Sequence, residues 1–249
     1  MTDLHTHILP GMDDGASDLE TAMKLLQLQQ DQGVSRIALT SHYVCDKMRL
    51  EDFLSARDQA FARLQEELEE PNHQLEFRLG CEVYFSPRLL EMELRPLCME
   101  GTDVMLLELP VRHQPHLLRE LLFHLQTEGI IPLVAHVERY DYVYRDPRIL
   151  AQWAEWGAYA QVNADSILGA QGKRVLDLIK WGLVHAVASD AHTLEKRRPN
   201  LEQAFRVITQ RLGEETVARL ERQALALFEG EEPTSERVHV PKRLGMWWV

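Results

Sequence analysis

Side chains of the kinds that bind metal ions stand at the C-terminal ends of short apolar runs throughout this sequence. The run 104–107 leads into Glu108, for example, and the run 132–135 leads into His136. Seven such runs, mostly separated by helix-like stretches, predict a parallel α/β barrel, in which the chemistry lies at the C-terminal rim of the strands. Five histidines and several carboxylates at one rim would form a multinuclear metal site. The side chains at the ends of these runs are His5, His7, His42, Glu82, Glu108, His136, Asn163, Asp190 and His192.

The length of the chain fits one domain. A chain of 249 residues has the usual size of a single α/β barrel, which is about 250 residues. We expect this domain to cover residues 1–229 and an irregular tail to cover residues 230–249. The first expected helix begins at Ser17-Asp18-Leu19-Glu20, which fits a capping box. Apolar residues at helical spacing predict helices over residues 17–33, 50–70, 115–127, 200–212 and 214–229.

Composition excludes several classes of partner. A formal net charge of −12 argues against nonspecific binding to nucleic acid or to an anionic membrane. The three cysteines, Cys45, Cys81 and Cys98, are odd in number and show no C-x-x-C spacing. A disulfide framework is therefore not expected, and a reducing cytoplasm is the expected location. We expect no secretory signal before the first strand, because Asp3, His5 and His7 interrupt any apolar segment there. We also expect no membrane insertion, because the sequence has no run of about 18 apolar residues.

Two short motifs carry the strongest metal signal. Side chains alternate along a strand, so His5 and His7 of D-x-H-x-H point to the same side and can share a cation. The motif S-D-A-H repeats this spacing with a carboxylate, Asp190, and an imidazole, His192. Asp190 taken alone could also be a turn residue.

Four other candidates have ordinary alternatives when each is taken alone. Asp14 lies in D-D-G, which is a common turn signal. Glu82 and Glu108 follow apolar strand ends, where an unpaired carboxylate is costly to bury, and each could pair with an arginine at the rim. His136 could be a core histidine that binds no metal.

In their order along the chain, these motifs resemble the PHP (polymerase and histidinol phosphatase) superfamily, whose fold is a distorted seven-stranded (β/α)7 TIM-like barrel that holds three metal ions. More narrowly, they look like the bacterial metal-dependent protein-tyrosine phosphatases of capsule and exopolysaccharide loci. The sequences that carry this resemblance are D-L-H-T-H-I-L-P-G-M-D-D-G, T-S-H, G-C-E-V-Y, A-H-V-E-R-Y, Q-V-N and A-S-D-A-H-T-L. The resemblance runs from about residue 1 to residue 228 and lapses in the tail, which ends Met246-Trp247-Trp248-Val249. It implies nine metal ligands: His5, His7, Asp14, His42, Glu82, Glu108, His136, Asp190 and His192.

The charge of the implied ligand set supports a site loaded with metal. Four of the ligands are carboxylates, and five are imidazoles, which must be neutral to bind metal. Without metal, four like charges would raise the pKa values of the carboxylates. Three divalent ions would change the charge of the site from −4 to +2, which suits a phosphate dianion. Imidazole and carboxylate ligands fit manganese, iron or zinc, and the resemblance implies manganese.

Such a site is expected to hydrolyse a phosphate ester with a hydroxide held between metal ions, which attacks phosphorus in line. Arg139 lies three residues beyond His136, where its planar guanidinium would bind phosphate oxygens. The family has an Arg-Pro pair in the following loop, and this chain has Arg197-Arg198-Pro199 there. We therefore expect Arg197, or Arg198 in a shifted register, to supply a second contact. Each arginine could instead be a solvated surface charge.

The resemblance implies a protein-tyrosine phosphatase that acts on the phosphorylated tail of a bacterial tyrosine kinase, and through it on polysaccharide export. The Y-D-Y-V-Y sequence over residues 140–144 could form a wall of the phenol pocket, although Tyr142 and Tyr144 could equally be packing residues.

Other functions fit the sequence less well. A cysteine-based tyrosine phosphatase is excluded, because none of the cysteines has an arginine six positions later. An amidohydrolase barrel would need a bridging lysine and further histidines where this chain has Glu108, His136 and Asn163. Histidinol phosphatase, or another small-molecule phosphatase of the superfamily, is the main alternative. A non-catalytic kinase-docking regulator is weakened by the intact ligand set.

Overall fold

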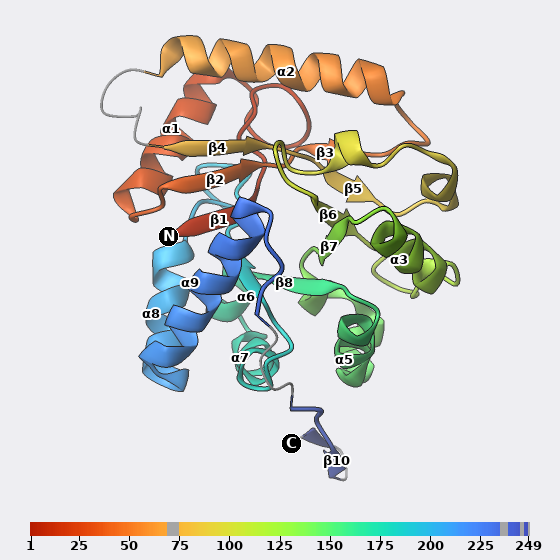
Figure 1. Cartoon of the computed structure of the whole chain (residues 1–249). Helices are drawn as coiled ribbons and strands as arrows, with labels where there is room; N and C mark the ends of the chain where they lie inside the picture. Colours follow the sequence, from red (N-terminus) through yellow and green to blue (C-terminus); the bar gives the residue numbers. More distant parts are fainter. Residues whose placement is uncertain (69–74, 235–238, 245–246, 249) are drawn as a thin grey trace.

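The computed structural model describes residues 1–68, 75–234, 239–244 and 247–248. Nine strands of this part of the chain pair in parallel, in the order β1-β2-β4 in one sheet and β3-β5-β6-β7-β8-β9 in the other (Figure 1). The predicted α/β class with parallel strands is confirmed. The pairings recorded among these residues form two sheets and not one closed ring. The strands are β1 (Thr2–Thr6), β2 (Arg36–Leu39), β3 (His42–Tyr43), β4 (Glu76–Leu79), β5 (Glu82–Tyr84), β6 (Val104–Glu108), β7 (Ile131–Val134), β8 (Tyr159–Asn163) and β9 (Ala186–Ala188).

Seven apolar runs become nine strands because two of them are interrupted. Thr40 and Ser41 separate β2 from β3, and Gly80 and Cys81 separate β4 from β5. At the first break the hydroxyl of Thr40 accepts a hydrogen bond from the backbone N–H of Thr6, at 3.0 Å. The Thr40 side chain thus accepts a hydrogen bond that a backbone carbonyl accepts in a regular sheet. β2 ends at Leu39, and the rim residue His42 begins β3 in the second sheet.

Backbone contacts also join the two ends of the strand series. The end of β1 pairs with the segment that follows β9 through a parallel bridge between Thr6 and Ala191. The N–H of Asp190 donates to the carbonyl of His5, and the N–H of His7 donates to the carbonyl of Ala191, both at 2.9 Å. The two strongest sequence motifs are therefore held side by side by the backbone itself.

The predicted helices are confirmed where the structure describes them, apart from shifts of a few residues at their ends. Figure 1 shows α1 and α2 covering the sheet that contains β4, α9 beside β1, and α8 beside α9. Residues 69 and 70 of the predicted helix 50–70 lie outside the described residues. Four helices between residues 141 and 180 were not predicted. The helices are α1 (Leu19–Asp31), α2 (Leu50–Glu67), α3 (Leu118–Thr127), α4 (Asp141–Arg145), α5 (Arg148–Glu155), α6 (Ala164–Leu168), α7 (Gly172–Lys180), α8 (Leu201–Leu212) and α9 (Glu214–Glu229), with short 3-10 turns at Pro87–Glu91, Arg95–Leu97 and Val137–Arg139.

Buried apolar side chains fill the interior beneath the C-terminal ends of the strands. Leu4, Leu106 and Leu133 come from β1, β6 and β7 and belong to one buried cluster with Leu227 and Phe228 of α9. Each of these side chains is at most 1% exposed. Burial of one such side chain stabilises a fold by about 1.5–3 kcal/mol. This apolar floor, formed by the five side chains, therefore stabilises the strands that carry the rim residues.

The tail returns to the body of the protein. The N–H of His239 donates to the carbonyl of Trp181 at 2.9 Å. Within residues 230–249, expected as irregular, two short antiparallel strands form, β10 (Arg243–Leu244) and β11 (Trp247–Trp248). Among the described helices, none combines the length and the apolar composition needed to span a lipid bilayer.

Candidate metal centre

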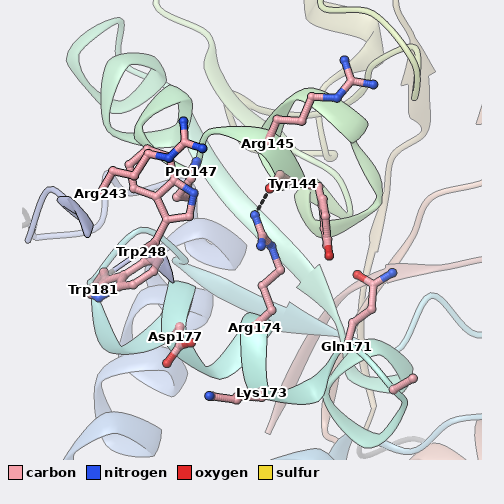
Figure 2. Close-up of a pocket in the computed structure, with 11 residues that line it drawn as sticks. Tyr144, Arg145, Pro147, Gln171, Lys173, Arg174, Asp177, Trp181, Arg243 and Trp248 are labelled. Carbon is pink, nitrogen blue, oxygen red and sulfur yellow. Dashed lines mark hydrogen bonds between the residues drawn. The ribbon is translucent and has the colours of Figure 1, made fainter. Parts of the chain in front are cut away.

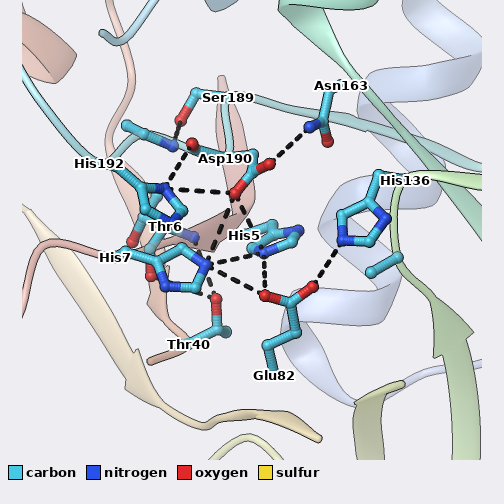
Figure 3. A network of polar contacts seen from close by, with 12 residues as sticks. His5, Thr6, His7, Thr40, Glu82, His136, Asn163, Ser189, Asp190 and His192 are labelled. Atoms are coloured by element: carbon cyan, nitrogen blue, oxygen red, sulfur yellow. Dashed lines mark hydrogen bonds and ion pairs between the residues drawn. The ribbon is translucent and has the colours of Figure 1, made fainter. Parts of the chain in front are cut away.

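His5 and His7 lie on β1 with their rings fully buried and their Nε2 atoms 3.0 Å apart (Figure 3). The other ring nitrogen of each is held by an oxygen. Nδ1 of His5 lies 3.2 Å from Oε1 of Gln161, and Nδ1 of His7 lies 2.7 Å from Oδ2 of Asp13. When these oxygens accept hydrogen bonds from the Nδ1–H groups, both Nε2 lone pairs point at one another, an arrangement that a shared cation or proton stabilises.

Glu82 is the central carboxylate of the cluster. Its Oε2 lies 3.0 Å from Nε2 of His5, 3.2 Å from Nε2 of His7 and 3.1 Å from Nδ1 of His42. Its Oε1 lies 2.7 Å from Nε2 of His136. A single buried carboxylate therefore reaches four imidazoles.

Asp190 faces the histidines from the opposite side. Its Oδ1 lies 3.5 Å from Nε2 of both His5 and His7 and 3.4 Å from Nδ1 of His192. This buried oxygen has no hydrogen-bond partner among the described residues. Leaving a buried acceptor unsatisfied costs about 1–3 kcal/mol, and a bound cation would remove that cost.

The outer part of the cluster is more open to solvent. Oδ1 of Asp14 lies 3.4 Å from Nε2 of His42 and 3.5 Å from Nε2 of His192. The side chain of Asp14 is 66% exposed. A cavity of about 570 Å³ opens here, and Asp14 and His192 lie in its wall beside Arg197. This is the side from which a large substrate can approach the cluster.

All nine residues that the resemblance implies as ligands are brought together. Eight of them form three groups, within each of which one ligand atom per residue lies within 4.8 Å of the others. The ninth, His136, contacts Glu82 and lies 3.7 Å from a Glu108 oxygen. The groups are His5, His7 and Asp190; His7, Asp14, His42 and His192; and His42, Glu82 and Glu108.

Two rim residues have a left-handed backbone, which is unusual outside glycine. The φ angles of His136 and Asp190 are 32° and 52°. Such conformations are strained for residues with a Cβ and persist where the surrounding structure fixes them. Both residues belong to the cluster, so local strain is concentrated where the side chains converge.

The ionisation of the cluster shows its demand for positive charge. Burial would raise the pKa of Glu82, but the His5, His136 and His42 imidazoles hold it well below its usual range. Burial likewise opposes protonation of His7, yet its contacts with Asp13 and Glu82 raise its pKa to about 10. Positive charge beside these carboxylates is thus favoured, and divalent cations would supply it when bound.

The expected general rise in carboxylate pKa is wrong. Burial, and then the Glu82 carboxylate, raise the pKa of Glu108. At Asp190 burial acts in the same direction, but His5, His7 and the neighbouring arginines lower the pKa overall. The imidazoles that lie between these carboxylates can carry positive charge, and that charge lowers the carboxylate pKa values.

The structure brings both predicted arginine positions to Asp190. Nη2 of Arg139 lies 2.8 Å from Oδ2 of Asp190, and Nη2 of Arg197 lies 2.7 Å from the same oxygen. Nη1 of Arg197 also lies 3.7 Å from Asp14. Arg198 is exposed, and no ion pair between described residues involves it. Of the two arginines in that loop, Arg197 is the one that faces the cluster.

Three residues that orient the cluster were not singled out from the sequence for this role. Asp13 accepts from His7 and also from the N–H of His42, at 2.8 Å. Gln161 contacts His5 and accepts from the N–H of His136, also at 2.8 Å. Asn163, named only as a strand end, donates from Nδ2 to Oδ2 of Asp190 at 2.6 Å. In the sequence, Asp13 is the first Asp of D-D-G, and Gln161 and Asn163 are the first and last residues of Q-V-N.

The tyrosines after the cluster have different roles. The hydroxyl of Tyr140 donates to the carbonyl of Ala135 at 2.8 Å, and its ring stacks on that of Tyr142. Both rings are buried. Tyr144 is 55% exposed. Of the two open alternatives, packing therefore describes Tyr142, while Tyr144 faces outward.

Comparisons with known proteins agree with this geometry. The sequence model of the family described as "Capsular polysaccharide synthesis, CpsB/CapC" matches residues 1–226. The tyrosine-protein phosphatase YwqE of Bacillus subtilis is 34% identical over 224 residues, which cover 86% of each chain. The putative tyrosine-protein phosphatase CapC of Staphylococcus aureus is 30% identical over 212 residues, which cover 82% of each chain.

Solved structures give the same result. A structure from work on YwqE of Bacillus subtilis and CpsB of Streptococcus pneumoniae, described as unique metal-dependent tyrosine phosphatases, matches with a TM-score of 0.86 and 28% identity. The match covers 98% of this chain and 100% of that one. A TatD-family hydrolase from Entamoeba histolytica shares the fold, with a TM-score of 0.52 and 11% identity. The resemblance found in the sequence is confirmed, and the chain belongs to the CpsB/CapC family of capsular polysaccharide synthesis proteins.

Proposed function

We propose that this chain is a metal-dependent protein-tyrosine phosphatase that hydrolyses phosphotyrosine on a protein substrate. The observation that carries the proposal is the position of Asp190. One of its oxygens faces the imidazoles of His5 and His7, and the other accepts from Arg139 and Arg197. Groups that bind metal and groups that bind phosphate thus meet at one carboxylate. Relatives named as tyrosine-protein phosphatases support the same activity.

We propose three divalent ions, most reasonably manganese, with iron or zinc as alternatives. His5, His7 and Asp190 would hold one ion, and Asp14, His42 and His192 a second. Glu108 and His136 would hold the third, and Glu82, which contacts imidazoles from all three sets, would be a further ligand. The unsatisfied Oδ1 of Asp190 and the purely nitrogen and oxygen donor set fit such ions. When bound, divalent ions supply a nucleophile at neutral pH and offset the charge of the transferring phosphoryl group.

The side chains around the ions prepare the site for a phosphate dianion. Asp13 and Gln161 fix the ring orientation of His7 and His5, which keeps the Nε2 atoms aimed inward. Arg139 and Arg197 keep two guanidinium groups at the edge of the cluster, where planar, fixed donors match phosphate oxygens. Their shared contact with Asp190 holds them in place before substrate arrives.

The wider assignment extends the same proposal. We propose that the two sheets together make a distorted seven-stranded barrel, in which β2 continues into β3 and β4 into β5. The catalytic unit would cover residues 1–229, followed by a tail over residues 230–249. The protein substrate would be the tail of a bacterial tyrosine kinase that controls polysaccharide synthesis. A cytoplasmic location fits the free, buried thiols of Cys45, Cys81 and Cys98.

The test is phosphate release from a phosphotyrosine peptide, measured beside phosphohistidinol on the same manganese-loaded sample. The proposal requires a clear preference for the peptide. A preference for phosphohistidinol would instead indicate a small-molecule phosphatase. Loaded protein that hydrolyses neither compound would indicate a non-catalytic role.

A further inference from the structure

A second cavity, of about 630 Å³, lies outside the metal centre and is lined by none of its nine candidate ligands (Figure 2). It is formed where α4, α7 and the C-terminal tail come together. Basic and aromatic side chains make up most of its wall. Those on which the inference depends are Arg145, Lys173, Arg174, Trp181, Arg243 and Trp248.

The charge of this cavity is opposite to that of the protein. Four cationic side chains line it, and Asp177 is the one carboxylate among the lining residues. The whole chain carries a formal charge of −12. A local basic surface on an acidic protein attracts a short anionic ligand, while the overall charge disfavours a long polyanion such as nucleic acid.

The wall of the cavity is built from ordered contacts. The guanidinium of Arg174 lies over the Tyr144 ring at 3.9 Å from its centroid. It also donates to the backbone carbonyls of Val143 and Tyr144, and Figure 2 shows the second of these bonds. On the other side, Arg148 lies over the Trp248 ring at 5.0 Å from its centroid. These contacts tie α4 to α7 and place the tail beside α5.

The cavity begins close to the metal centre along the chain. Arg145 is six residues after Arg139, and the extended backbone of Tyr140 separates the turn that ends at Arg139 from α4, so their backbones lie no more than about 20 Å apart. An extended peptide covers about 3.3 Å per residue. Roughly six residues of extended peptide, or fewer, would therefore span from Arg139 to this cavity.

We propose that this basic cavity binds carboxylate side chains of the substrate polypeptide, within about six residues of the phosphotyrosine. Acidic flanking sequence would then be a determinant of substrate choice. The inference rests on the proposed phosphatase function, which supplies the peptide at the rim. Cations on α4, α7 and the tail are spread along the cavity, which suits several separate carboxylates, and the rings of Trp181 and Trp248 offer apolar surface to the intervening peptide backbone.

The experiment uses two phosphotyrosine peptides that differ only in three flanking positions, which carry Asp or Glu in one peptide and Asn or Gln in the other. The readout is the ratio of kcat/KM for the acidic peptide to kcat/KM for the neutral one, so that a general loss of activity cancels. We expect a ratio of roughly ten, as for the sum of two or three weak ion pairs, expressed mainly in KM. The double variant Arg145→Glu with Lys173→Glu should bring the ratio close to one.

The matched control is Lys24→Glu with Arg63→Glu, which makes the same change in net charge at exposed positions of α1 and α2 that do not line this cavity. It should keep the ratio of the unaltered chain. A ratio near one in the unaltered chain, or an equal fall in the control, would overturn the inference.

A further arm separates this inference from the proposed function. If the unaltered chain hydrolyses no aryl phosphate, the proposed function fails. Binding of the unphosphorylated acidic peptide, followed by fluorescence anisotropy, then tests the cavity by itself. Binding that is lost in the pocket double variant and kept in the control supports the cavity, and absence of binding in the unaltered chain contradicts it.

Discussion

Nη2 of Arg139 donates to Oδ2 of Asp190 across 2.8 Å, which joins a candidate phosphate-binding group to a candidate metal ligand. The same oxygen also accepts from Arg197 and Asn163, whereas Oδ1 of Asp190 is left facing the histidines. Asp190 is therefore oriented by three donors on one oxygen and presents the other to a cation. Because the two oxygens of Asp190 have different partners, we predict different effects for replacement of the arginines and for replacement of the metal ligands.

Replacement of Arg139 should impair chemistry and spare metal binding. In Arg139→Ala, Asp190 still accepts from Arg197 and Asn163, so metal content should stay unchanged. Turnover on an aryl phosphate should fall by roughly 100- to 1,000-fold, the usual effect of removing a positioned donor to transferring charge. Arg139→Lys should recover only part of this loss, because an ammonium cannot reproduce the guanidinium fork. Full activity in Arg139→Ala would remove the residue from the mechanism, and loss of metal would show that its role is structural.

Loss of a candidate ligand should abolish turnover without unfolding the protein. His42→Ala and Asp190→Ala remove groups from the rim, whereas the apolar floor beneath it stays intact. Circular dichroism should therefore show native structure in both variants, and hydrolysis should be undetectable. Near-normal turnover in both would place the active site elsewhere.

Asp13 is predicted to act through the His7 imidazole that it orients and through the backbone of His42 that it holds. Loss of such a partner typically weakens metal binding by about 10- to 100-fold. Asp13→Ala should show this loss in a manganese titration, and Asp13→Asn, which keeps an acceptor oxygen, should show less of it. The neighbouring N-cap variant Asp18→Ala should lower thermal stability without changing manganese affinity. Equal manganese affinity in Asp13→Ala and the unaltered chain would contradict the positioning role.

The differences between sequence and structure have local physical causes. The sequence predicted which side chains gather at the rim, because apolar runs and the residues after them are read directly. It did not predict that Thr40 interrupts a strand, since this depends on a tertiary hydrogen bond to Thr6. The first helix is capped by Asp18, whose carboxylate accepts from the N–H of Thr21, and not by Ser17, because either residue suits the motif.

At the metal centre, too, the sequence alone does not determine which partner each side chain contacts. D-D-G contains two carboxylates, and only the backbone path determines that Asp13 turns to His7 while Asp14 turns to His42 and His192. That path depends on Gly15, where a Cβ would lie 2.1 Å from the carbonyl oxygen of His7. The four unpredicted helices between residues 141 and 180 are five to nine residues long, too short for helical periodicity to be clear.

Acid should destabilise the fold through His185, which lies away from the metal centre. Its Nδ1 accepts from the N–H of Ala160 at 3.1 Å, and burial with the nearby Arg219 guanidinium lowers its pKa to about 4. The unfolded chain, with an ordinary pKa near 6.5, binds this proton more readily, so stability is present above pH ~6.5 and is lost as the pH falls toward ~4. The loss between pH 7 and pH 5 should be about 2 kcal/mol.

Urea unfolding at these two pH values checks the effect of His185. His185→Gln, which keeps an acceptor but does not titrate, should remove most of the pH-dependent difference. The exposed His116→Gln should leave it unchanged. Identical pH dependence in His185→Gln and the unaltered chain would assign the acid sensitivity to other groups.

The most direct test of the central claim is elemental analysis of the manganese-reconstituted protein, with hydrolysis of a phosphotyrosine peptide measured on the same sample. Convergence of nine ligand side chains predicts roughly two to three divalent ions per chain. It also predicts loss of hydrolysis when a chelator removes them and recovery when manganese is returned. Less than about one ion per chain, or hydrolysis that persists after the ions are removed, would contradict a metal-dependent phosphatase.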